Sequence, residues 1–114
     1  MGTADSKYID LASGLPRVAN NEMLYKKLAA KFEASVDMAA FDSAIADQDH
    51  AKAGEVVHAA KGVARNLSLA AFYDNSVVLM DQLRDGGTPA QENVDAFKRL
   101  YVETIQAINE YLAD

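Results

Sequence analysis

The chain contains no cysteine among its 114 residues. Without thiols it can form no disulfide, no thiolate nucleophile and no cysteine-based zinc site, and it suits a reducing compartment. It also lacks any apolar run near the roughly 18 residues that a transmembrane helix needs. Its opening residues, MGTADSKYID, contain no hydrophobic signal core. We therefore expect a cytoplasmic protein that does not associate with a membrane.

Basic residues are few, since 11 lysines and arginines stand against 17 aspartates and glutamates, for a formal net charge of −6. Nucleic-acid backbones are bound by clustered cations, and these are scattered, so we expect no nucleic-acid partner. The sequence also lacks a glycine-rich phosphate loop, a serine or cysteine nucleophile elbow and an acidic triad for magnesium. The chain is thus expected to hold no cofactor or metal of its own and no ATP-cleaving site.

Half of the residues are hydrophobic, which is enough for one core, so residues 1–114 are expected to form a single domain. The apolar residues recur at helical spacing and no stretch alternates with the period of a strand, which predicts an all-α fold. The expected stripes are Leu24, Leu28 and Phe32; Met38, Phe41 and Ile45; Ala53, Val56, Ala60, Val63, Ala64 and Leu67; Leu69, Phe72, Val77, Leu79, Met80 and Leu83; and Val94, Phe97, Tyr101, Ile105, Ile108 and Leu112.

Cap and turn residues divide these stripes into helices. The first long helix begins near Asn21 and either runs on through residues 38–45 or kinks between Ser35 and Asp37. Residues 88–91, Thr-Pro-Ala-Gln, form an expected capping box with proline as the first helical residue of the last helix. Four long amphipathic helices with short turns imply an antiparallel four-helix bundle, with a short accessory N-terminal helix across one end.

The helix expected over residues 51–68, which Asp49 should cap, carries a histidine on its outward face. At 100° per residue, His58 lies almost opposite the apolar positions, so its side chain should point to solvent. The patch around it consists of Gly54 and Gly62, each one turn away, and of Ala51, Glu55, Lys61 and Arg65. Each mid-helix glycine costs about 1 kcal/mol relative to alanine. The simplest reason for the pair is steric, because glycine leaves the imidazole open to an object as large as another protein.

A lone histidine is commonly a buried, hydrogen-bonded residue or an idle surface one. The helical phase of His58 argues against burial, and an idle residue would make the surrounding glycines and cations a coincidence. A metal site is not expected, because Glu55 and His58 have the Glu-x-x-His spacing only once, without the second set of a di-iron bundle. His50 is expected to be a helix-boundary residue, too far along the helix from His58 to share a metal with it.

Five residues of this helix form a recognisable pattern. His58, Lys61, Gly62, Asn66 and Leu67 reproduce H-x-x-K-G-x-x-x-N-L, which resembles the core of bacterial histidine-containing phosphotransfer (HPt) domains. The residues similar to the G-L-x-R … L-Y-x-x-L … F opening of such domains are Gly14, Leu15, Arg17, Leu24, Tyr25, Leu28 and Phe32. The resemblance covers nearly the whole chain. It departs at Ser68, where the family commonly has glycine, and a serine there could cap the next helix instead.

The resemblance implies a role in a multistep two-component phosphorelay. His58 would accept a phosphoryl group through Nε2 from a receiver-domain phospho-aspartate and pass it to another receiver. Lys61 would stabilise the phosphoryl oxygens, and Gly62 would leave room for them. The partners would be response-regulator receiver domains or a hybrid histidine kinase. The receiver would bring the magnesium ion, so the chain would be a phosphoryl carrier rather than a stand-alone enzyme. The implied catalytic residues are His58, Lys61 and Gly62, and the binding residues are Gly54, Glu55, Ala51 and Arg65, the last as a second cation.

Two other functions are open at this point. The same surface could dock a kinase or receiver domain without phosphoryl transfer, although the presence of both His58 and Lys61 favours transfer. A purely structural bundle is the third possibility, and replacing the two glycines by alanine would then only stabilise it. In each case we expect a monomer, because no apolar stripe is left over once the core is assigned.

Overall fold

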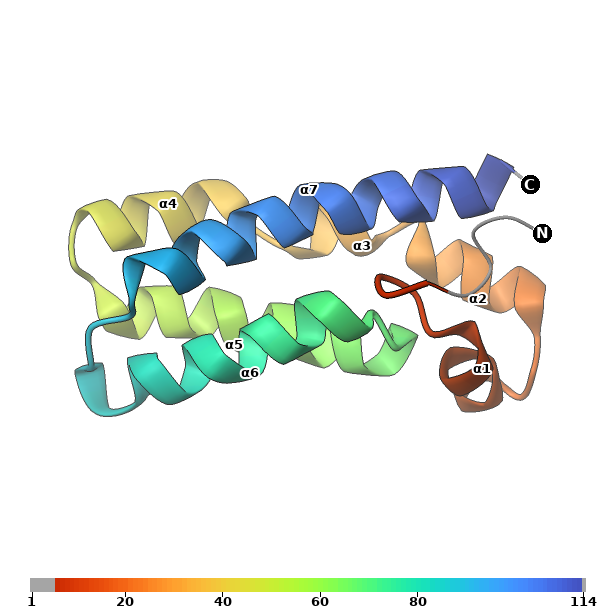
Figure 1. Ribbon diagram of the computed structural model, residues 1–114, viewed down its shortest axis with the longest axis horizontal. Coiled ribbons are helices and arrows are strands. Elements are labelled where there is room, and N and C mark those ends of the chain that lie inside the picture. The colour runs from red at the N-terminus through yellow and green to blue at the C-terminus, as the bar shows by residue number, and fades with distance from the viewer. Residues whose placement is uncertain (1–5, 114) are drawn as a thin grey trace.

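The structure, a computed structural model, describes residues 6–113 and is helical nearly throughout (Figure 1). In chain order the elements are α1 (Leu11–Gly14), the 3-10 turn η1 (Leu15–Val18), α2 (Glu22–Ala29), α3 (Phe32–Ser35), α4 (Met38–Ala46), α5 (His50–Leu67), α6 (Ala70–Leu83), the 3-10 turn η2 (Arg84–Gly86) and α7 (Gln91–Ala113). Apart from a single β-bridge at Asp10, residues 6–113 contain no strand, which confirms the all-α prediction. The expected domain also includes residues 1–5 and 114, which lie outside the described residues.

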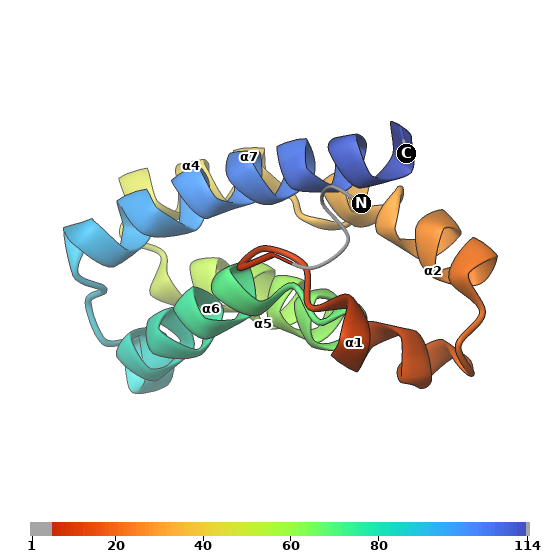
Figure 2. The ribbon, with the colours of Figure 1, turned by 45° about the vertical axis from the view of Figure 1, so that its right-hand side comes forward.

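Helices α4, α5, α6 and α7 run along the long axis of the molecule, which measures 42 × 22 × 20 Å. α5 packs against both α4 and α6, and α6 packs in turn against α7. Both views place α1 and α2 at one end, next to the turn between α5 and α6 (Figures 1 and 2). The connections from α4 to α5 and from α6 to α7 lie at the opposite end.

The first predicted long helix is divided into α2, α3 and α4. At the end of α3 the Ser35 hydroxyl donates to the Phe32 carbonyl at 2.6 Å. Val36 then has an extended backbone, with φ −112° and ψ 115°. Asp37 caps α4, because its carboxylate accepts a hydrogen bond from the Ala40 amide at 3.0 Å. The kinked alternative is therefore correct, and this part of the chain consists of short helices.

Four phenylalanine rings form the centre of the core. Phe32 of α3 meets Phe72 of α6 nearly edge-on, with 5.2 Å between ring centroids. Phe72 lies 5.0 Å from Phe97 of α7, and Phe97 lies 4.7 Å from Phe41 of α4. All four rings are fully buried, and all four belong to the predicted apolar stripes. Burial of each such ring stabilises the fold by about 1.5–3 kcal/mol. These contacts join α3 and α4 to α6 and α7, which lie far from them in the sequence.

The predicted apolar stripe of α2 is wrong by one residue. Leu24 and Leu28 are 39% and 37% exposed, whereas Tyr25 and Ala29 are buried. The reason is the place of α2 at the end of the molecule, where its inward face meets the end of α5. There the Tyr25 hydroxyl donates to the Leu67 carbonyl at 2.6 Å. A tyrosine can bury its ring and still satisfy its hydroxyl in this position, so it replaces leucine on the inner face.

The start of the last helix also differs from the prediction. α7 begins at Gln91, two residues after the proline expected to open it. The Gln91 side chain donates to Asp95 at 2.9 Å, within its own helix, instead of reaching back to a capping residue. The Ala90 amide is bound by the Gln82 side chain of α6 at 3.0 Å. A contact from another helix thus takes the place of the predicted capping box.

Candidate functional site

α5 is fixed at both ends by local contacts. Asp49 caps its start, as predicted, and accepts a hydrogen bond from the Lys52 amide at 3.1 Å. Ser68 follows its last turn in a left-handed conformation, with φ 55° and ψ 47°. The prediction that Ser68 would cap the next helix is wrong, because Leu69 holds that position and α6 receives no side-chain cap. Ser68 instead occupies the place after a helix end where glycine is favoured.

His58 lies on the exposed side of α5, as its helical phase predicted. The buried residues on the other side are Ala53, Val57, Ala60, Ala64 and Leu67. Because α5 packs against α6 as well as α4, its buried arc is wider than predicted: Val57 is buried, and the predicted Val56 and Val63 are partly buried against the core. The imidazole makes no hydrogen bond or ion pair with residues 6–113. Its ring nitrogens are therefore open to a reaction partner.

Gly54 and Gly62 leave open space beside His58. A Cβ atom placed on either glycine would meet no heavy atom within 4 Å apart from its own helix backbone and chain neighbours. Gly14 is different, because a Cβ there would lie 2.8 Å from the Tyr25 ring. Packing therefore explains Gly14 but neither glycine of α5. Each of these two glycines costs the helix about 1 kcal/mol relative to alanine, and no packing contact requires a glycine at either position.

The other expected site residues surround His58 on α5. Ala51, Glu55 and Arg65 are exposed, and Lys61 is half-buried. Lys61 follows His58 by three residues, so their Cβ atoms are neighbours at about 5–6 Å on the helix surface. Neither cation takes part in an ion pair within the described part of the chain. The ammonium and guanidinium groups are thus available to an incoming anion.

Two grooves run along the side of α5 that faces α2, α3 and α4. One, of about 230 Å³, is lined by Leu28, Lys31, Ser35, Val63, Asn66 and Leu67. The other, of about 210 Å³, is lined by Ser35, Asp37, Ala40, Lys52, Glu55, Val56 and Ala59. His58 lines neither groove. This placement agrees with a side chain that projects from the helix rather than into a cleft.

Sequence reasoning missed a third hollow, which contains one of the expected site residues. It has a volume of about 230 Å³ and is lined by Asp10, Ser13, Arg17, Ala64, Arg65, Ser68, Ala70 and Tyr73. Arg17 belongs to the N-terminal stretch that carries the HPt resemblance. No local spacing joins it to Arg65, however, and only the packing of η1 against α5 brings the two together.

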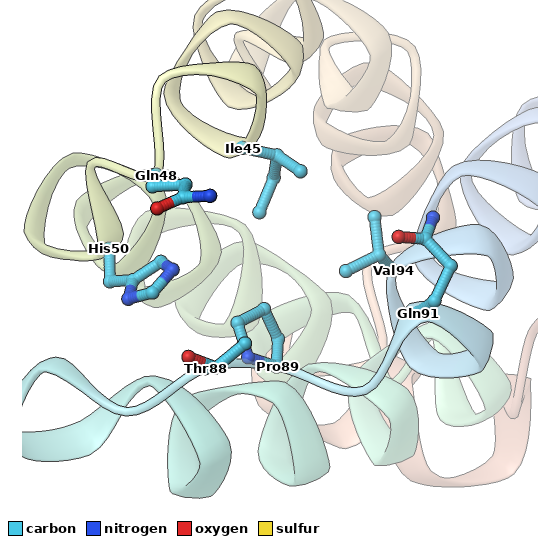
Figure 3. Close-up of a pocket in the computed structure, with 7 residues that line it drawn as sticks. All are labelled: Ile45, Gln48, His50, Thr88, Pro89, Gln91 and Val94. Atoms are coloured by element: carbon cyan, nitrogen blue, oxygen red, sulfur yellow. The ribbon is translucent and has the colours of Figure 1, made fainter.

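His50, the second histidine, is the first residue of α5 and faces the connection between α6 and α7. Its Nδ1 atom lies 3.1 Å from the Gly86 carbonyl oxygen. Figure 3 shows its ring beside Thr88 and Pro89 in a pocket at this end of the molecule. Eight residues of helix separate it from His58 by about 12 Å. His50 therefore stands at the helix boundary, as expected, and is not part of the His58 patch.

The described residues contain no group of three or more histidine, aspartate and glutamate side chains placed to hold a metal ion. Within residues 6–113 no helix has both the length and the apolar character needed to cross a bilayer.

Comparison with known proteins gives no match: no protein-family model, no curated protein and no solved structure is significantly similar to this chain.

Proposed function

We propose that the chain is a histidine phosphotransfer protein of a multistep two-component phosphorelay. In this proposal α4, α5, α6 and α7 form an antiparallel four-helix bundle, and α1 is the accessory helix at its end. The main support is the environment of His58. Its imidazole is exposed and has no partner among residues 6–113, and the positions one turn away on each side are glycines that packing does not require.

In the proposed reaction, the lone pair of His58 Nε2 attacks the phosphorus of an aspartyl phosphate on a receiver domain. A P–N bond forms, the P–O bond to the aspartate breaks, and the carboxylate leaves with the bonding electrons. The proton on Nδ1 stays on the ring, so the chain needs no general base for this step. Transfer to a second receiver reverses these events and restores the neutral imidazole. The free imidazole supports this role, since no hydrogen bond has to break first.

Lys61 is proposed to hold its ammonium against the phosphoryl oxygens, where the cation offsets the negative charge that the transferred group brings. Gly62 is proposed to leave room for the phosphoryl group. Arg65 adds a second cation, and the remaining contact residues are Ala51, Gly54 and Glu55. The magnesium ion used in such transfers supplies further charge neutralisation and is proposed to come with the receiver domain.

The partners in this proposal are response-regulator receiver domains or the receiver of a hybrid histidine kinase. The chain would act among them as a cytoplasmic monomer and as a carrier rather than a stand-alone enzyme. Its contribution to the reaction is the nucleophile and the cations beside it, and the acidic, phosphorylated half of the site belongs to the partner.

Transfer of labelled phosphate from phosphorylated receiver domains tests the proposal. The wild type, His58→Gln and the matched control His50→Gln are compared, with circular dichroism to check that each is folded. We expect label that is labile to acid and stable to base on the wild type and on His50→Gln, and none on His58→Gln. Label on all three proteins would place the phosphoryl group elsewhere and refute the assignment to His58.

A different outcome would favour phosphorylation-independent docking. If several receivers bind the wild type and none transfers phosphate to it, the surface around His58 serves for docking alone. Binding is measured by titration calorimetry with the same receivers, so that the two functions are separated on one set of proteins.

A further inference from the structure

Several elements meet at the hollow that contains Arg65, beside the turn between α5 and α6. We name it the arginine pocket, and its polar residues are Asp10, Ser13, Arg17, Arg65, Ser68 and Tyr73. The backbone holds these elements together, since the Asp10 amide donates to the Ser68 carbonyl at 2.9 Å and the Ala71 amide donates to the Lys7 carbonyl at 3.1 Å. The pocket is therefore built by the fold and not by one flexible loop.

Within residues 6–113 the two arginines of the pocket have no partner of opposite charge. The ion pairs found within residues 6–113 use other cations, and neither Arg17 nor Arg65 is among them. Asp10 lines the same pocket, but it caps α1 and accepts a hydrogen bond from the Ser13 amide at 3.2 Å. Two arginines against one aspartate leave the pocket with a surplus of positive charge, in a chain whose net charge is −6.

Hydroxyl groups add hydrogen-bond donors to this charge. The Ser68 hydroxyl donates to the Ser13 hydroxyl oxygen at 3.0 Å, so the Ser13 hydroxyl proton is free to donate to another acceptor. Tyr73 is half-buried, and its phenol makes no hydrogen bond within the described chain. Guanidinium groups with nearby hydroxyl donors are the chemistry that binds an oxyanion such as a carboxylate.

The pocket opens near His58. Arg65 follows His58 by seven residues, which is two turns or about 10.5 Å along the same side of α5. A stable protein interface covers about 800 Å² on each partner. A protein centred on His58 would therefore also cover Arg65 and the mouth of the arginine pocket.

We propose that the arginine pocket binds an aspartate or glutamate side chain of the receiver domain that docks at His58. This inference rests on the proposed function. Exposed arginines bind a small free anion weakly, because water and salt screen the charge. The same arginines bind more strongly once a partner covers them and excludes water. Because the chain is acidic, the pocket gives an acidic partner one favourable point of approach and so sets its orientation.

The test compares Arg17→Glu with Arg84→Glu, using a receiver that phosphorylates the wild type. Both variants change the net charge equally, but Arg84 lies in η2 at the opposite end of the molecule, where it pairs with the exposed Asp81. We expect Arg17→Glu to raise KM about tenfold, with kcat within about twofold of the wild type. High salt should shrink this difference. Arg84→Glu should leave KM within about twofold.

The outcomes separate this inference from the proposed function. If the wild type is labelled and Arg17→Glu behaves like Arg84→Glu, the pocket has no role in docking and phosphotransfer stands. If no receiver labels the wild type, the proposed function fails; if none binds it either, the inference fails as well. If citrate or inorganic phosphate already saturates the shifts of the Ser13 and Ser68 amide NMR signals at micromolar concentration, the pocket is a site for a small free anion and the docking role is overturned. An acidic-to-arginine change in the receiver that restores the KM of Arg17→Glu would identify the bound carboxylate.

Discussion

Replacing Gly54 and Gly62 by alanine tests the steric argument for His58 in two independent ways. A Cβ at either position meets no heavy atom within 4 Å beyond its own helix, so alanine fits without strain. Each change gains about 1 kcal/mol of helix propensity, and the double variant should be about 2 kcal/mol more stable to unfolding. For a chain of this length the gain corresponds to a rise of about 8 °C in Tm.

The two added methyl groups stand one turn before and one turn after His58, where an approaching receiver would meet them. We expect the double variant to accept phosphate more slowly, in kcat/KM, from a receiver that labels the wild type. Urea unfolding at 25 °C measures the stability, and rapid-quench transfer of labelled phosphate measures the rate. Gly14→Ala serves as the packing control. It should lose stability, because its Cβ would lie 2.8 Å from the Tyr25 ring.

Two results would refute the reasoning. A double variant that is more stable and transfers phosphate at the normal rate would show that the glycines do not clear the approach to His58. A double variant that is no more stable than the wild type would show that the open space around the two glycines is not open in solution.

Three further changes test the structure. Ser68→Gly should stabilise the protein by about 1 kcal/mol in urea unfolding, because glycine adopts the left-handed conformation at this position (φ 55°) without the cost that serine bears; a loss of stability would show that the serine hydroxyl outweighs that cost. Tyr25→Phe should cost about 1–2 kcal/mol in the same assay, since it removes the 2.6 Å hydrogen bond to the buried Leu67 carbonyl, and an unchanged midpoint would contradict that contact. Burial, followed by the hydrogen bond to Glu22, raises the pKa of the Tyr111 phenol above its ordinary value of about 10. The folded state therefore holds this proton more tightly than the unfolded chain, so stability should be full below about pH 10 and fall as the pH rises above it, and Tyr111→Phe should make this fall shallower.

The apolar period of the sequence was enough to predict the all-α fold and the outward direction of His58. Both depend on local geometry. The 3.6-residue turn of the helix fixes the direction of the His58 side chain relative to the apolar residues of the same helix. The cap at Asp49 is local in the same sense, since it uses the amide of Lys52 three residues later. Such features could be predicted because every atom involved lies within one or two turns of helix.

The features that sequence reasoning missed depend on contacts between distant segments. Tyr25 is buried in place of Leu24 because its hydroxyl meets the end of α5, and the capping box at residues 88–91 is replaced by a contact from Gln82. The meeting of Arg17 with Arg65 likewise depends on the packing of η1 against α5. The sequence by itself determined which helix carries the exposed histidine and which way that histidine points, because both are properties of a single helix. Only the tertiary structure decided that Arg17 and the hydroxyls of Ser13 and Tyr73 gather beside Arg65, because their positions depend on how η1, α1 and α6 pack against α5.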